Sequence, residues 1–301
     1  MAIHNGTQLA NMAIGGFVDT GVLHRTIWKD SGFSGLAGKG DTVNVRRLGK
    51  DSAANFAGTA TASTVTQGVT AVTLDEQPYM KRLVTSADKV LKVEDYYGEI
   101  IAPDVGAIGE YIEAQVAATL AATGATEITG ASARAAIIGA REFLTSKKVP
   151  LADRFLACSP TFISAILGED WVTADKIGDE GSALRSAVIG RAFGFTILES
   201  THVADVDFDT GGVDPTAYAY HRSGVVMASR TLSAPEGGAK GSSVAADGLS
   251  ARVVEDWDNS ALSDVVTVDT LFGLAETLDQ DVDAPDGDPF DQSHRIVPVY
   301  V

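Results

Sequence analysis

GDTVNVRRLGKD, at residues 40–51, alternates apolar and polar side chains in the manner of a β-strand. A second stretch, VTLDEQPYMKRLVTSAD at residues 72–88, begins with the same alternation. No residue between Asp51 and Asp75 is charged, and Phe56 is the only aromatic residue among the alanines, threonines, serines and glycines that dominate this segment. The segment has strand formers but little bulk for a core. We predict a long two-stranded arm with a loose tip, covered by a neighbouring subunit because so long a hairpin is marginal alone in water.

The composition is that of a globular protein with one large domain or two modest ones. The chain has 301 residues, 45% of them apolar, enough to bury a sizeable core. No run of about 18 apolar residues occurs, so no membrane span is expected, and residues 1–13 lack the basic start and apolar run of a secretory signal. Cys158 is the only cysteine, which excludes an intrachain disulfide and a cysteine-based zinc site. An intracellular site of assembly is the simplest interpretation.

The net charge of −17 is unevenly distributed along the chain. Residues 1–50 hold six Lys/Arg against three Asp/Glu, whereas residues 202–301 hold five against 18. A chain this acidic repels nucleic-acid phosphates as a whole, so any contact with nucleic acid is expected in the N-terminal segment. Solubility is the simplest role for the acidic excess.

The middle of the chain predicts helices with clear boundaries. A long helix starts at Pro103, which suits a first helical turn, carries apolar residues at helical spacing and stops near Thr123–Gly124. Ser132 is a cap for a second helix that ends before Pro150. RFLACSPTFISAILG, at residues 154–168, reads as a buried strand followed by a capped helix.

Strands are predicted in the second half, at residues 193–200, 217–230 and 249–274, the last as an antiparallel pair. Strands and helices mix without a regular βαβ rhythm, so the α+β class is favoured over a doubly wound sheet. From Leu278 the chain is acidic and broken by Pro and Gly, and we expect an extended tail there up to the apolar end IVPVYV.

No catalytic or cofactor-binding motif is present. The sequence lacks G-x-S-x-G, H-E-x-x-H and a P-loop, and its five histidines are scattered without a matching acid and nucleophile. Asp205, Asp207 and Asp209 alternate as in a calcium loop, but the glycine falls one place late, at Gly211. A second acidic cluster lies between residues 281 and 288. We favour solvated loops for both, and predict no catalytic residue, cofactor or metal site.

The order of these elements resembles that of the tailed-bacteriophage major capsid proteins with the Hong Kong 97 coat fold. GDTVNVRRL, VTLDEQPYMKRLVTSAD, the helix from Pro103, RFLACSP, GRAFGFTILES, AYAYHRSGVVMASR and VVEDWDNSALSDVVTVDTLFGL follow one another as in that family. The resemblance implies six regions: an N-terminal arm at 1–39, an extended loop at 40–86, a peripheral domain with a spine helix at 87–130, an axial domain at 131–248, returning peripheral strands at 249–277 and a C-terminal tail at 278–301.

The resemblance also implies a structural function rather than catalysis. Such proteins assemble into hexamers and pentamers that form an icosahedral shell around double-stranded DNA, assembled in the host bacterial cytoplasm and found in the virion. The expected partners are other copies of the chain, non-specifically contacted DNA, a separate scaffolding protein, a portal and a decoration protein. The alternatives are an encapsulin-like compartment shell, or less readily a metal-dependent soluble enzyme. We predict intersubunit contacts by Arg46, Arg47, Lys50, Phe56, Lys81, Arg82 and Tyr111.

Overall fold

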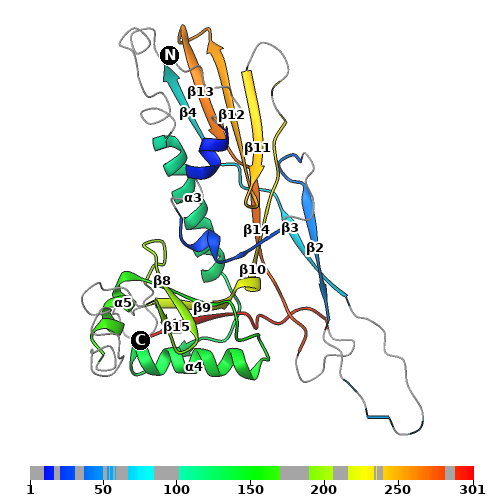
Figure 1. Ribbon diagram of the computed structural model, residues 1–301, viewed down its shortest axis with the longest axis vertical. Coiled ribbons are helices and arrows are strands. Elements are labelled where there is room, and N and C mark those ends of the chain that lie inside the picture. The colour runs from blue at the N-terminus through cyan, green and yellow to red at the C-terminus, as the bar shows by residue number, and fades with distance from the viewer. Residues whose placement is uncertain are drawn as a thin grey trace.

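The computed structural model shows an elongated α+β chain, which confirms the predicted fold class (Figure 1). Within the described part of the chain, no helix is long and apolar enough to cross a membrane. The residues that the structure describes are 10–16, 21–30, 37–49, 53, 55, 56, 58, 67–84, 102–169, 190–205, 216–233, 235, 240–281 and 289–301.

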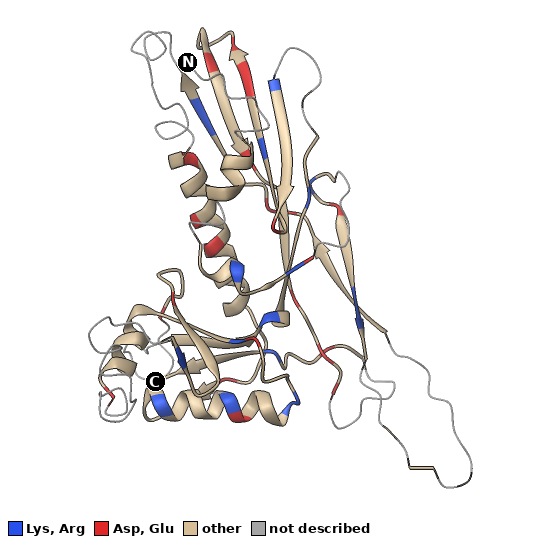
Figure 2. Cartoon of the chain, viewed as in Figure 1, with Lys and Arg blue, Asp and Glu red and all other residues tan. Residues whose placement is uncertain are grey.

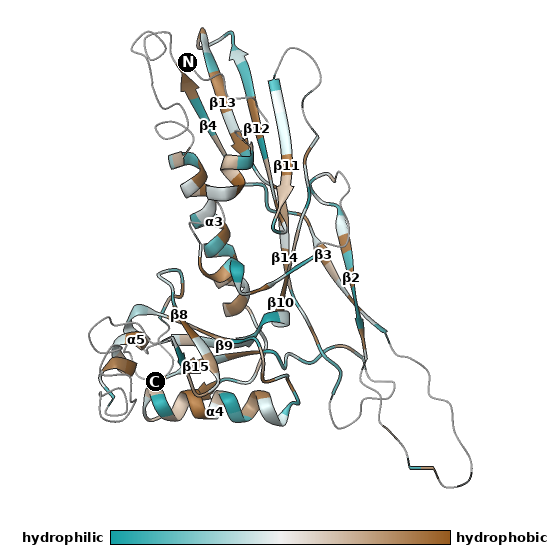
Figure 3. Cartoon of the chain, in the orientation of Figure 1, coloured by the Kyte–Doolittle hydropathy of each residue, from teal (hydrophilic) through white to brown (hydrophobic). Residues whose placement is uncertain are grey.

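A four-stranded antiparallel sheet and one long helix form the upper body in Figure 1. The strand order is β11 (Lys240–Ala246), β12 (Leu249–Asp258), β13 (Ser263–Asp269) and β4 (Tyr79–Val84). Helix α3 (Ala102–Ala121) lies against this sheet and buries its apolar stripe in the largest core cluster. The predicted helix is confirmed, although it ends just before the expected stop at Thr123–Gly124. Figure 3 shows brown apolar segments on both layers where they meet.

A second body is built on a six-stranded sheet. Its strand order is β5 (Ile128–Thr129), β15 (Ile296–Tyr300), β9 (Thr216–His221), β6 (Arg154–Cys158), β8 (Phe195–Glu199) and β7 (Arg191–Ala192). Helices α4 (Ala133–Ser146) and α5 (Pro160–Leu167) pack on it through their own core cluster. Both predicted caps are confirmed, because Ser132 accepts from the amide of Ala135 and Ser159 from that of Phe162.

The apolar end of the predicted tail lies inside this second sheet. β15 pairs with β9 on one side and β5 on the other, and all five of its residues are buried. Residues 278–301 are therefore not only an extended tail: their last strand completes the sheet whose other strands come from residues 128–221. The physical reason is non-local pairing, which a short apolar run does not reveal.

The predicted returning arm at residues 72–88 is split between two sheets. β2 (Thr42–Leu48) pairs antiparallel with β3 (Gln67–Thr73), as predicted, but β4 leaves this hairpin and pairs with β13. The prediction of one continuous arm is wrong because Leu74–Pro78 carries the chain from one sheet to the other. A three-stranded sheet of β1 (Trp28–Asp30), β10 (Val225–Ser229) and β14 (Phe272–Glu276) lies between the hairpin and the rest of the molecule. β10 pairs with β1 and β14, and β11 pairs with β12, so neither strand belongs to the six-stranded sheet.

Candidate intersubunit surface

The base of the β2–β3 hairpin packs against its own chain. Val45, Val72 and Leu74 are buried together with residues of β10 and the turn before β14. Gly273 permits this packing, because a Cβ there would lie 2.0 Å from the carbonyl oxygen of Thr73. The expectation that a neighbouring subunit covers the whole hairpin is therefore wrong for its base.

The outer end of the hairpin is where apolar side chains face water. Leu48 is 74% exposed, Phe56 71% and Val69 58%. Isolated exposed apolar residues are ordinary, but three on one projecting segment indicate a surface that a partner can cover. Arg46 is exposed on the same segment, and Lys50 lies outside the described residues.

Arg47 contacts its own chain, although it was predicted to contact a neighbour. Its Nη2 lies 2.9 Å from Oδ1 of Asp279, and its Nη1 donates to the carbonyl oxygen of Leu278. Asp279 also accepts from Nε and Nη2 of Arg295, at 2.6 and 3.0 Å. All three side chains are nearly buried, so one carboxylate joins the hairpin to the strand that leads into the six-stranded sheet.

The group formed by Arg47, Asp279 and Arg295 extends to a histidine. Arg295 donates a hydrogen bond to the hydroxyl of Ser223, which is itself hydrogen-bonded to Nδ1 of His221. Burial, and then the nearby positive charge of Arg295, lower the pKa of His221 to about 4. At neutral pH this imidazole therefore carries no charge beside the guanidinium.

The two other predicted cations also pair within the chain. Arg82 on β4 donates from Nε and Nη2 to the buried carboxylate of Asp104, in the first turn of α3. Lys81 lies 3.8 Å from Asp258 at the end of β12. These two ion pairs tie β4 to α3 and to the end of β12.

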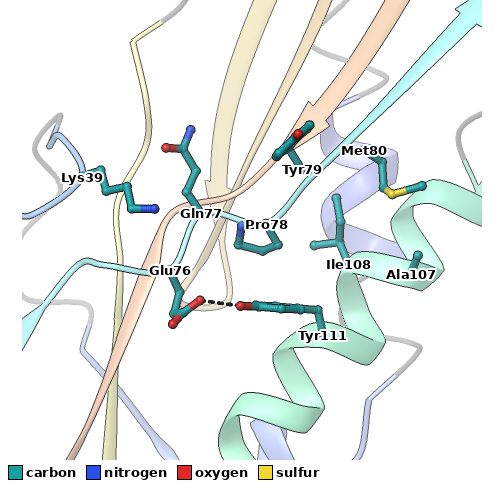
Figure 4. Close-up of a pocket in the computed structure, with 9 residues that line it drawn as sticks. All are labelled: Lys39, Glu76, Gln77, Pro78, Tyr79, Met80, Ala107, Ile108 and Tyr111. Atoms are coloured by element: carbon teal, nitrogen blue, oxygen red, sulfur yellow. Dashed lines mark hydrogen bonds between the residues drawn. The ribbon is translucent and has the colours of Figure 1, made fainter.

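Tyr111 borders an open groove where the chain passes from the hairpin to β4 (Figure 4). The groove has a volume of about 340 Å³ and is lined mainly by apolar side chains of Pro78–Met80 and of α3. The Tyr111 hydroxyl donates to Glu76 at 2.6 Å, and this bond, followed by partial burial, raises the pKa of Tyr111. Tyr79, at 67% exposed, forms one wall.

Sequence reasoning missed a buried carboxylate in the middle of α3. Glu113 accepts from the backbone amides of Leu23 and His24, at 2.7 and 2.9 Å, and contacts Nδ1 of His24 at 2.6 Å. Burial raises the pKa of Glu113, but the bonds from His24 and Leu23 outweigh it, so the net pKa is lowered. The N-terminal segment is thereby tied to α3. The sequence feature that could have indicated this burial is the position of Glu113 beside the apolar stripe of α3.

No group of metal-ligating residues occurs among the residues that the structure describes. Asp205 accepts from Thr161 and from the amide of Thr216, whereas Asp207 and Asp209 lie outside the described residues. Cys158 is buried at the end of β6, and burial raises the pKa of its thiol, as expected of a small buried apolar residue rather than a nucleophile.

Comparison with solved structures gives extensive matches. A structure from Mycobacterium phage Che8 matches with a TM-score of 0.61 and 18% identity, over 92% of this chain and 90% of that one. The capsid structure of the cyanophage P-SCSP1u matches with a TM-score of 0.62 and 14% identity, over 93% and 87%. The chain has the fold of phage capsid proteins.

The capsid of Ralstonia phage GP4 shares this capsid fold, with a TM-score of 0.57 and 11% identity over 92% of this chain and 87% of that one. No protein-family model and no curated protein matches the sequence. The Hong Kong 97-like coat fold, which the order of elements predicted, is thus confirmed by structure, and at these identities the likeness is one of fold.

Proposed function

We propose that this chain is the major capsid protein of a tailed phage. It would form hexamers and pentamers that close into an icosahedral shell around double-stranded DNA. The observation that carries the proposal is the capsid fold, matched over about nine-tenths of this chain and of the solved capsid chains. The proposed place of the protein is the virion, after assembly in the host bacterial cytoplasm, and its role is structural rather than enzymatic.

The hairpin supplies the contact between copies. Its base is fixed to the body by the cluster around Val72 and by the Arg47–Asp279 ion pair. Its outer end, with Phe56 exposed, then lies against the Tyr111 groove of the next copy, which offers apolar walls of similar chemistry. Burying a phenylalanine contributes about 1.5–3 kcal/mol. Each copy gives and receives this contact, so the stabilisation is repeated around a closed ring.

Electron microscopy of the purified protein tests the function. We expect closed shells, tubes or capsomer rings, and a monodisperse monomer at all concentrations would contradict the proposal. Replacing residues 51–66 with an Asn-Gly turn shortens the hairpin while keeping β2 and β3. The variant is expected to fold and to lose shell formation, and normal shells from it would refute the role of the outer end.

Paired cysteines locate the contact. Phe56→Cys combined with Ala107→Cys, an exposed groove residue on α3, is expected to give disulfide-linked multimers in assembled material. Each single variant is the control, because the native Cys158 is buried and should not react. Only monomers on a non-reducing gel, from shells that are otherwise intact, would place the outer end elsewhere.

Two other functions remain to be separated from this one. An encapsulin-like shell would enclose cargo enzymes, so co-purification of a cargo protein in place of DNA would favour it. A metal-dependent enzyme would show turnover by a stable monomer on addition of Ca²⁺ or Mg²⁺.

The proposal also includes contacts with a separate scaffolding protein, a portal, a decoration protein and non-specifically bound DNA. Co-expression and reconstruction of filled shells test these contacts.

A further inference from the structure

The inward face of the β2–β3 hairpin is covered by two different parts of its own chain. Buried and exposed residues alternate along both strands, so each strand turns every second side chain inward. Near the base these inward residues include Val45 and Val72, which share a core cluster with residues of β10. Further out they are Arg47 and Gly68, which stand opposite each other in the register. These two contact the C-terminal segment instead.

The ring of Phe290 lies directly on the backbone of Gly68. A Cβ added at Gly68 would stand 2.5 Å from Cγ and Cδ1 of Phe290, so a larger residue there would displace the ring. A glycine within a strand weakens the strand, and here the close approach of the ring accounts for its presence. Arg47, across the register, binds Asp279 and the carbonyl oxygen of Leu278, so both strands are held at one position. Figure 2 shows blue basic residues on β2 and red acidic residues on the segment that follows β14. We call the contacting part of this segment the tail clamp, residues 278–279 and 290–292.

The tail clamp is itself fixed to the rest of the molecule. Asp279 and Gln292 exchange two backbone hydrogen bonds, at 2.8 and 3.0 Å, which join its two halves. Arg295, which leads into β15, binds the carboxylate of Asp279. The hydroxyl of Ser293 lies 2.8 Å from that of Thr123, just past the end of α3. The tail clamp is therefore attached to the six-stranded sheet and to the end of α3, and it can support the hairpin from there.

We propose that Phe290 is a positioning residue for the contact between copies of the chain, because its ring fixes the direction in which the outer end of the hairpin projects. The inference rests on the proposed shell function. The pair Leu48–Gln67 is the last of the hairpin and stands one position beyond the tail clamp, so the outer end begins there. A two-stranded hairpin is marginal alone in water, so its direction depends on what supports its inward face. A hairpin already held in its bound direction loses less conformational entropy when the next copy binds.

Phe290→Ala removes the ring and leaves the ion pair of Arg47 in place. We expect the protein concentration needed for assembly to rise at least about tenfold. Hydrogen exchange of the unassembled chain should become faster in β2 and β3 and stay unchanged in α3 and in the six-stranded sheet. Asp291→Ala, which changes the exposed residue beside Phe290, is the matched control and should equal the wild type in both measurements. If Phe290→Ala fails to fold, Phe290→Val replaces it.

Exchanging the sizes of the two residues tests the contact itself. Gly68→Leu alone would overlap the Phe290 ring and should impair assembly as strongly as Phe290→Ala does. In the double variant, Gly68→Leu with Phe290→Ala, the leucine occupies the space that the ring leaves. Assembly should then return to within about threefold of the wild-type concentration, which two independent losses would not produce.

The outcomes separate this inference from the proposed function. Assembly of the folded Phe290→Ala variant at the wild-type concentration overturns the inference while the shell function stands. Faster exchange throughout the molecule, or no recovery in the double variant, also overturns it, because Phe290 would then act on folding in general. A wild-type protein that forms no shell contradicts the proposed function instead. Exchange in β2 and β3 of the unassembled chain then still decides whether Phe290 holds the hairpin.

Discussion

Asp279→Asn is expected to lower the free energy of unfolding by about 3–5 kcal/mol, the usual cost of removing one partner from a buried ion pair. Asp279 accepts one guanidinium hydrogen bond from Arg47 and two from Arg295 at 2.6–3.0 Å, and the three side chains are only 8–13% exposed. The substitution keeps the shape and the backbone bonds to Gln292 but leaves two cations without a counter-charge. The expected loss is a large share of the roughly 5–15 kcal/mol that stabilises a typical protein.

Urea unfolding of the unassembled chain, followed by circular dichroism, measures this loss. Arg46→Gln is the matched control, because Arg46 is exposed beside Arg47 on the same strand and should change stability by no more than about 0.5 kcal/mol. Arg47→Met combined with Asp279→Asn completes a double-mutant cycle, in which the coupling between the two residues should be at least about 1 kcal/mol. A loss below about 1 kcal/mol for Asp279→Asn alone would show that the pair acts as an exposed one and would refute the reasoning.

Further outcomes follow from single side chains. Gly273→Val should destabilise the chain by at least about 3 kcal/mol, because the new side chain would overlap the Thr73 carbonyl. Gly106→Ala, in open space within α3, should instead stabilise it by about 0.5–1 kcal/mol, so thermal melts should show a lower Tm for the first variant and a higher Tm for the second. Folding lowers the pKa of Glu113, so the stabilisation that its carboxylate contributes is present above pH 4.5 and is lost as the pH falls through the folded pKa. Glu113→Gln should therefore flatten the dependence of the free energy of unfolding on pH in this range, and an unchanged dependence would contradict the role of Glu113. Because the folded pKa of His221 is about 4, its contribution to stability is present above pH 6.5 and is lost as the pH falls from 6.5 to 4. An NMR titration of the His221 imidazole in the folded protein with a midpoint near pH 6.5 would contradict this.

Local features of the fold could be predicted from sequence, whereas long-range pairing could not. Ser132 and Ser159 cap their helices as expected because a cap depends on residues three positions away. The departure of β4 from the hairpin and the burial of β15 depend on partners far along the chain, which alternation alone does not specify.

The candidate surface shows the same division. The exposure of Phe56 could be predicted, because the residues around it in the sequence have too little bulk to form a core with it. The pairing of Arg47 with Asp279 could not, since 232 positions separate them and either side chain alone reads as a solvated charge. Glu113 was missed for the same reason, as its partner His24 lies 89 residues away.

The place of β15 in the interior of its sheet has a consequence for synthesis. The strands on either side of it, β5 and β9, leave the ribosome well before residues 296–300 do. Until then two neighbouring strands expose unpaired edges and the α4–α5 core lacks Val297 and Val299. The six-stranded sheet therefore closes only after residues 296–300 have been synthesised. A chain that stops short of them leaves β5 and one edge of β9 unpaired, and in the proposed shell such a chain would have no finished surface to offer its neighbours.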